Sequence, residues 1–139
     1  MDWLSAPQAL RSPLLMGILN LTPDSFHDGG AYLELAAARR RLEELSAAGA
    51  DLIDIGGMSS RPGHSPVQAE TEMARVLPLL REAAAVCPPP ISIDTDKAEV
   101  AAAALNAGAD MINYSGGKLD ADIFRLAADR DAPLIIMHR

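Results

Sequence analysis

The sequence predicts an α/β fold in which parallel strands alternate with helices. Short apolar runs recur along the 139 residues, segments with helical spacing separate them, and polar or glycine-rich loops follow most of the runs. The expected strands cover residues 14–21, 51–55, 91–94, 111–113 and 134–138. Because these runs are almost entirely apolar, they are typical of parallel strands that helices cover on one or both faces.

The first expected strand runs into a polar loop that ends at Gly30, and a helix is expected from Tyr32 to Ala48. Apolar residues of this helix recur at three- and four-residue steps and form one stripe. They are Leu35, Ala38, Leu42 and Leu45. Gly49 follows where helices commonly end in a left-handed residue.

The second helix is expected over residues 68–86, with Pro78 either bending it or splitting it into two pieces. Its expected inward residues are Met73, Val76 or Leu77, Leu80 and Ala84. Three consecutive prolines follow at 88–90. They exclude helix and favour an extended chain, which leads into the third expected strand. An alanine-rich helix over 98–107 ends at Gly108, and a fourth helix is expected over 119–129.

A short sequence pattern occurs twice and indicates a repeated βα unit. Residues 48–54 and 107–113 share the order helix end, Gly-Ala-Asp, apolar pair and polar residue. Strict alternation implies parallel pairing with the helices on one outer side. A (β/α)8 barrel takes about 250 residues, whereas this sequence reaches only a fifth strand. The residues therefore predict either an open α/β sheet or the N-terminal half of a barrel.

Composition narrows the classes of function. The formal net charge is −7, which argues against nucleic acid as the main partner. The single cysteine, Cys87, excludes an internal disulfide and fits a cytoplasmic setting. No apolar run approaches the roughly 20 residues of a membrane span, and the N-terminus lacks a secretory pattern. One domain over residues 1–139 is expected, with residues 1–12 as an irregular lead-in.

Polar side chains lie at or just beyond the carboxyl end of every expected strand. They are Asn20, Asp54, Asp94, Asn113 and His138. Any one of them could simply cap a helix or close a turn. Together they predict a ligand site, because the carboxyl ends of parallel strands carry the functional loops.

The loop after the second strand is the main candidate for anion binding. Two glycines, Ser59, Ser60 and Arg61 offer backbone amides, hydroxyls and a planar donor fork; an ordinary turn with a surface arginine is the alternative. Asp94 could accept two parallel N–H donors of a heterocycle, and Asn113 could contact a second edge of the same ring; a structural carboxylate is equally compatible with the sequence. The three histidines are too scattered to predict a zinc site.

Four segments in order resemble dihydropteroate synthases. They are MGILNLTPDSFHDGG at 16–30, GADLIDIGGMSSRPG at 49–63, ISIDTDKAEV at 91–100 continuing into GADMINYSGG at 108–117, and PLIIMH at 133–138. The resemblance implies a TIM-type (β/α)8 barrel, here about four βα units and a fifth strand. It also implies a transferase of folate biosynthesis that joins p-aminobenzoate to a dihydropterin methyl diphosphate and releases diphosphate.

The resemblance also assigns roles to residues. Asn20 would hold the Mg²⁺ that carries the diphosphate, and Ser60 and Arg61 would contact the phosphates. Asp94 and Asn113 would hold the pterin ring, on which Met137 would pack. Phe26 and Pro62 would help to enclose p-aminobenzoate. Arg61 and Asp94 are the expected catalytic residues.

The sequence departs from the family at two positions within these segments. Met58 replaces a common glutamate of the second loop, and Tyr114 replaces the aspartate that usually follows the fourth-strand asparagine. The family's later motifs lie beyond residue 139, so the chain alone is expected to be incomplete or inactive. It could dimerise or associate with a complementing half-barrel. An inactive fragment, a non-enzymatic pterin-binding half-barrel and a relative of the pterin-dependent methyltransferases remain alternatives, although the TPDSF and SRPG loops argue against the last.

Overall fold

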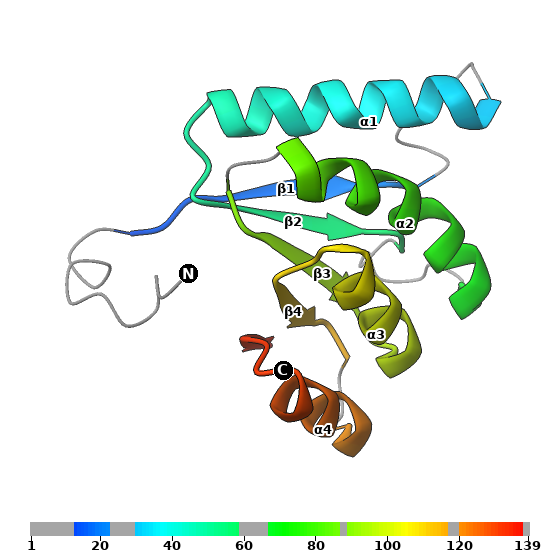
Figure 1. Cartoon of the computed structure of the whole chain (residues 1–139), viewed down its shortest axis with the longest axis vertical. Helices are drawn as coiled ribbons and strands as arrows, with labels where there is room; N and C mark the ends of the chain where they lie inside the picture. Colours follow the sequence, from blue (N-terminus) through cyan, green and yellow to red (C-terminus); the bar gives the residue numbers. More distant parts are fainter. Residues whose placement is uncertain (1–12, 23–29, 59–66, 87–88, 117–119, 138–139) are drawn as a thin grey trace.

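The computed structural model describes residues 13–22, 30–58, 67–86, 89–116 and 120–137. Within them, five strands form one sheet in the order β1-β2-β3-β4-β5, with a helix between each consecutive pair (Figure 1). The strands are β1 (Met16–Asn20), β2 (Leu52–Gly56), β3 (Ile91–Thr95), β4 (Met111–Tyr114) and β5 (Leu134–Ile136). The helices are α1 (Gly30–Ala47), α2 (Ala69–Val86), α3 (Ala98–Ala107) and α4 (Ala121–Asp129).

Every neighbouring pair of strands is parallel, as the alternation predicts. The helices follow one another along the sheet, because α1 packs on α2, α2 on α3 and α3 on α4 (Figure 1). Sequential strand order with successive helices in contact requires all four helices to lie on one face of the sheet. The described residues therefore form an open five-stranded sheet with one layer of helices. This is the arrangement expected for the first half of a (β/α)8 barrel.

The hydrophobic core lies between this sheet and the helices. One row of paired residues across the strands is wholly apolar and faces the helical layer: Leu19, Ile55, Ile93, Ile112 and Leu134. The helices contribute Ala38, Leu42, Val76, Leu80 and Ile123, among others. Leu35 and Leu45 also pack against this core, so the predicted stripe of α1 is confirmed.

Of the two outcomes predicted for Pro78, splitting of the second helix is excluded, because α2 is one helix with the proline inside it. Fully buried residues flank the proline on both sides, and their packing offsets the missing backbone donor. These residues are Val76, Leu79, Leu80 and Ala83. Met73 is only half-buried, so the inward face of α2 lies slightly to one side of the predicted stripe.

Two glycines end helices as predicted, since Gly49 has a φ of 88° and Gly108 a φ of 112°. The strands and helices differ from their predicted bounds mainly by a few residues at their ends, where periodicity is least informative. Among the described residues, no helix combines the length and the apolar character needed to cross a membrane.

The repeated Gly-Ala-Asp sequence has one structural role in both copies. The Asp51 carboxylate accepts a hydrogen bond from the backbone N–H of Leu15 at 2.8 Å, and Asp51 N–H donates to the Leu15 carbonyl at 2.8 Å. Asp110 makes the same reciprocal pair with Ile91, again at 2.8 Å in both directions. Each aspartate therefore fixes the start of a strand against its neighbour, which explains why the unit recurs.

We expect Asp110→Ala to lower the free energy of unfolding by about 1–2 kcal/mol, because the N–H of Ile91 loses a charged acceptor in a partly buried site. Urea denaturation measures this change. Asp110→Asn is the matched control, since its amide oxygen can still accept the bond and should preserve most of the stability. Equal losses in both variants would contradict the role assigned to the carboxylate oxygen.

Candidate functional site

Strand register places three polar side chains in one row at the carboxyl end of the sheet. Asn20 pairs with Gly56, Gly56 with Asp94, and Asp94 with Asn113. The residue before each of these belongs to the apolar row under the helices, and strand side chains alternate between faces. Asn20, Asp94 and Asn113 therefore lie together on the face that the helices leave uncovered. We call these three residues and Gly56 the polar row.

Gly56 leaves room at the centre of the polar row. A Cβ atom at this position would lie 3.3 Å from Asn20 Oδ1 and 3.5 Å from Asp94 Oδ2. The side chains of the two flanking strands thus converge over the glycine backbone. An amide oxygen and a carboxylate oxygen meet there, and both are groups that accept hydrogen bonds or bind hard cations.

Asp94 has an acceptor that the described residues do not fill. Its Oδ1 atom is buried and has no hydrogen-bond partner among them. Burial raises the pKa of Asp94, a hydrogen bond from the Ser115 side chain opposes this effect, and the negative charges of Glu72 and Asp96 add to it. A buried carboxylate oxygen without a donor is costly, so a ligand N–H at this point would be stabilising.

Asp54 lies two residues before Gly56 on β2 and therefore below the polar row, on the same face. It is 3% exposed. Its Oδ1 accepts a hydrogen bond from Ser92 Oγ, and its Oδ2 accepts one from Asn113 Nδ2 at 3.0 Å. Burial raises the pKa of Asp54 to about 6, although the bonds from Ser92 and Asn113 favour the ionised form. Asp54 therefore contacts the polar row through its hydrogen bond from Asn113.

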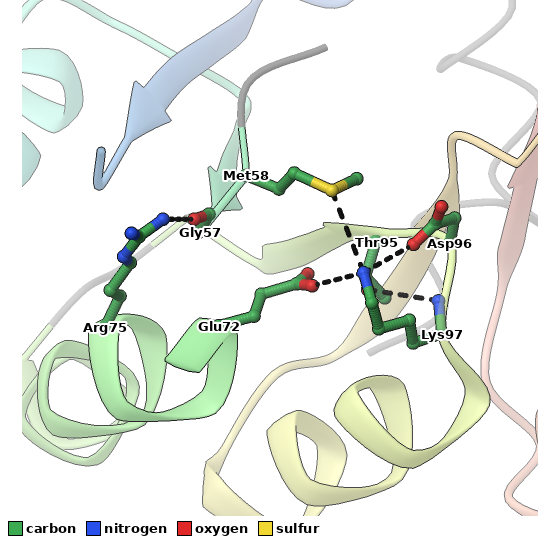
Figure 2. A network of polar contacts seen from close by, with 7 residues as sticks. All are labelled: Gly57, Met58, Glu72, Arg75, Thr95, Asp96 and Lys97. Atoms are coloured by element: carbon green, nitrogen blue, oxygen red, sulfur yellow. Dashed lines mark hydrogen bonds and ion pairs between the residues drawn. The ribbon is translucent and has the colours of Figure 1, made fainter. Parts of the chain in front are cut away.

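A second polar cluster joins the loop after β2 to the starts of α2 and α3 (Figure 2). Lys97 Nζ lies 2.9 Å from Glu72 Oε2 and 2.8 Å from Asp96 Oδ1. The Glu72 side chain is fully buried, and its Oε1 has no partner among the described residues. Burial lowers the pKa of Lys97, but the hydrogen bonds and negative charges of Asp96 and Glu72 raise it by more than burial lowers it. The pKa of Lys97 is therefore above its usual value.

The same cluster holds the first residues of the second loop. Arg75 Nη1 donates to the Gly57 carbonyl at 2.6 Å, and Met58 Sδ lies 3.7 Å from Lys97 Nζ (Figure 2). A Cβ at Gly57 would come within 2.9 Å of Glu72 Cγ and of Val76 Cγ1, so the loop can leave the sheet this close to α2 only as glycine. These contacts hold Gly57 and Met58 against α2 and the start of α3.

The two departures from the family pattern have different structural consequences. Met58 approaches a cation that already pairs with two carboxylates, so Lys97 does not depend on a glutamate at position 58. Tyr114 is 4% exposed and belongs to the hydrophobic core, next to the polar row but on the opposite face. Burial raises the pKa of its hydroxyl. Neither residue removes a side chain from the polar row.

Sequence reasoning identified Asn20, Asp54, Asp94 and Asn113, and the structure brings all four to one face. It missed Ser92 and Glu72. Both could have been found from spacing, because Ser92 is two residues before Asp94 in a strand and Glu72 is four residues before Val76 in a helix. Lys97 offered no comparable pattern, since its role depends on contacts between separate elements.

The other predicted site residues divide into two groups. Met137 follows β5 and is 43% exposed. Phe26, Ser60, Arg61, Pro62 and His138 lie outside the described residues. Across the described ranges, no group of three or more histidine, cysteine, aspartate or glutamate residues is placed to hold a metal ion.

Comparison with known proteins gives a consistent result. A family model described as pterin binding enzyme matches residues 16–139. The dihydropteroate synthase of Streptococcus pyogenes is 47% identical over 125 residues, which cover 89% of this chain and 47% of the relative. The chain thus spans about half the length of this curated relative.

Solved structures show the same relation. The Xanthomonas albilineans dihydropteroate synthase with 4-aminobenzoic acid superposes with a TM-score of 0.86 at 43% identity, covering 93% of this chain and 47% of that one. The Anaplasma phagocytophilum enzyme with bound 6-hydroxymethylpterin-monophosphate gives a TM-score of 0.81 at 45% identity, covering 90% and 48%.

We expect Lys97→Met to lower the free energy of unfolding by about 3–5 kcal/mol, because it leaves the buried Glu72 carboxylate without a cation. Thermal or urea unfolding measures the loss. The double variant Glu72→Gln/Lys97→Met removes both charges and should recover much of the stability. If the double variant is as unstable as the single one, the loss comes from packing of the lysine stem rather than from the ion pair.

The raised pKa of Asp54 predicts a pH-dependent stability. The folded chain holds this proton up to about pH 6, whereas the unfolded chain releases it near the ordinary value of 3.8. The stabilising contribution is therefore complete below pH 3.8 and is lost as the pH rises through about 6, by up to about 3 kcal/mol. Asp54→Asn, which cannot titrate, should gain stability relative to the wild type over this interval. Urea unfolding at pH 4 and pH 7.5 tests this, and a pH-independent difference would contradict it.

Proposed function

Because the chain belongs to the pterin binding enzyme family, we propose that it supplies half of the active site of a dihydropteroate synthase. The reaction joins p-aminobenzoate to a dihydropterin methyl diphosphate and releases diphosphate. The polar row carries this proposal, since it places two acceptors, Asp94 and Asn113, side by side at the carboxyl end of a parallel sheet. The similar synthases span about twice the length of this chain, so the activity is proposed for the protein that completes the site.

In this proposal, Asp94 is the main anchor of the pterin. Its buried Oδ1 would accept an N–H of the ring, and Oδ2 lies over Gly56, where a second donor could approach. Asn113 would contact the neighbouring part of the same ring edge, and Met137 would pack against the ring face. The similar synthase of Anaplasma phagocytophilum, solved with a bound 6-hydroxymethylpterin-monophosphate, supports this ligand class.

Asn20 fits the role of a Mg²⁺ ligand. Its Oδ1 lies 3.3 Å from where a Cβ of residue 56 would stand, and Mg²⁺ in phosphate sites takes only one or two protein oxygens besides phosphate and water. When bound, the ion would neutralise the negative charge that develops on the departing diphosphate. Arg61 and Ser60 would contact the same phosphates, and Phe26 and Pro62 would enclose p-aminobenzoate.

The chemistry requires breaking the C–O bond to diphosphate and forming a C–N bond to the amine of p-aminobenzoate, which then loses a proton. Asp94 and Asn113 would hold the pterin so that its methylene carbon faces the incoming amine. The guanidinium of Arg61 would stabilise the leaving group, because its charge grows as the C–O bond breaks. We further propose a cytoplasmic location, and a homodimer or a complementing half-barrel as the partner that completes the site.

We expect Asp94→Ala to abolish detectable pterin binding by the protein with a complete site, because the ring loses a charge-assisted acceptor worth a few kcal/mol in a buried position. Asp96→Ala is the matched control. Asp96 is exposed and pairs with Lys97 rather than facing the polar row, so its loss should barely change the affinity. Calorimetry that finds equal losses would refute Asp94 as the anchor.

An activity assay tests the proposed function itself. A monomer of residues 1–139, given p-aminobenzoate, the dihydropterin diphosphate and Mg²⁺, should turn over at least a hundredfold more slowly than a full-length synthase, since several electrostatic stabilisers are missing. The edge strands β1 and β5 are unpaired on their outer sides within the described sheet, and exposed Leu15, Ile18 and Ile136 lie on or beside them. Adding a segment that supplies the second half should raise the rate. Comparable turnover by the verified monomer would contradict the division of the site.

A further inference from the structure

The Asp54 carboxylate occupies an unusual place for a residue of a binding site. Both of its oxygens already accept hydrogen bonds, Oδ1 from Ser92 and Oδ2 from Asn113. With 3% of its surface exposed, the side chain is out of reach of a ligand lying on the polar row. Asp54 therefore does not serve as a direct ligand contact, and its influence must pass through the residues that it binds.

The bond to Asn113 fixes the direction of an otherwise ambiguous amide. An ionised carboxylate can only accept, so the amide nitrogen of Asn113 must face Asp54 Oδ2. The Asn113 carbonyl oxygen then lies on the far side of the amide. If the amide were turned over, the Asn113 oxygen would lie within about 3 Å of Asp54 Oδ2, and a buried hydrogen bond would be lost. This loss lowers the population of the flipped orientation on the order of ten- to a hundredfold. Since the pKa of Asp54 is raised only to about 6, the carboxylate is ionised at pH 7.5.

We propose that Asp54 is a positioning residue that sets ligand specificity by locking the Asn113 amide with its carbonyl oxygen away from Asp54, beside the Asp94 carboxylate. Asp94 and Asn113 are paired in register on neighbouring strands, which places their side chains about 5 Å apart. Asp94 and Asn113 then present acceptor oxygens side by side and select a ring edge rich in N–H donors, such as a 2-aminopyrimidinone edge. The inference rests on the proposed pterin-binding function.

Ligand discrimination tests the lock at pH 7.5 with two probes, pterin and lumazine, in which an oxygen replaces the 2-amino group. The wild type should favour pterin. Asp54→Val removes the acceptor without adding a polar atom and should reduce the affinity ratio of pterin to lumazine at least tenfold, because Asn113 can then present either end of its amide. Asp51→Asn, at the opposite end of β2, is the control and should leave the ratio unchanged.

The exchange Asp54→Asn/Asn113→Asp separates orientation from folding. The donor and acceptor swap places, the pair remains directional, and the outward atom at position 113 is again an oxygen. This double variant should keep the ratio within about threefold of the wild type. If Asp54→Val does not fold, the double variant decides, and a loss of the ratio in a folded double variant would overturn the proposal.

A measurement without ligand completes the test. In ¹⁵N-edited NMR spectra of the wild type, one Asn113 amide proton should exchange slowly with water and resonate downfield, and both features should be lost in Asp54→Val. Identical exchange in the two proteins would overturn the lock. If the wild-type protein with a complete site binds neither probe, the proposed function fails. Pterin binding by the wild type with an unchanged ratio in Asp54→Val would instead remove only the role of Asp54.

Discussion

The register between β2 and β3 is the constraint on which the site depends. It pairs Gly56 with Asp94 and Asp54 with Ser92, so that two levels of polar groups stack on the face opposite the helices. A slip of one residue would turn Asp94 into the apolar core and bring Ile93 to the site. Ile55 and Ile93 are completely buried beneath the helices. A slip would move a carboxylate into this apolar layer at a large desolvation cost, so the register is held in place. The hydrophobic core thus places the polar row.

Two buried carboxylates, Asp54 and Glu72, show how the fold meets that cost in different ways. Asp54 is held by two neutral donors, a hydroxyl and an amide, and its pKa is still raised to about 6 because burial makes ionisation less favourable than in water. Glu72 is held by the Lys97 ammonium, which also joins α2 to the start of α3. Buried acids of this kind need not stabilise the chain, because replacing a whole buried ion pair with apolar residues is often neutral or stabilising. Their presence is better explained by the positions they impose, on Asn113 in one case and on the loop after β2 in the other.

The sequence predicted what depends on local patterns. Alternating apolar runs indicated the strands, and the polar residues that end them indicated Asn20, Asp94 and Asn113. The sequence left open whether Pro78 bends or splits its helix, because no short pattern reports the packing of Val76, Leu79 and Leu80 around the continuous α2. The partnership of Glu72 with Lys97 joins residues 25 positions apart. Such a contact follows from how α2 and α3 pack, and composition or periodicity within either element cannot reveal it.

Asp54 and Asp94 illustrate why position decides the role of an acid. Both are aspartates near the carboxyl end of a parallel strand, and both have a raised pKa because of burial. Asp54 lies one pleat deeper, where Ser92 and Asn113 fill both of its oxygens. Asp94 lies at the rim, where Oδ1 keeps an unfilled acceptor among the described residues. A ligand that fills this acceptor removes a desolvation cost, so binding energy at Asp94 comes partly from relief of that cost in the protein itself. The deeper aspartate has no such acceptor to fill, and its contribution must come from orienting the residue above it.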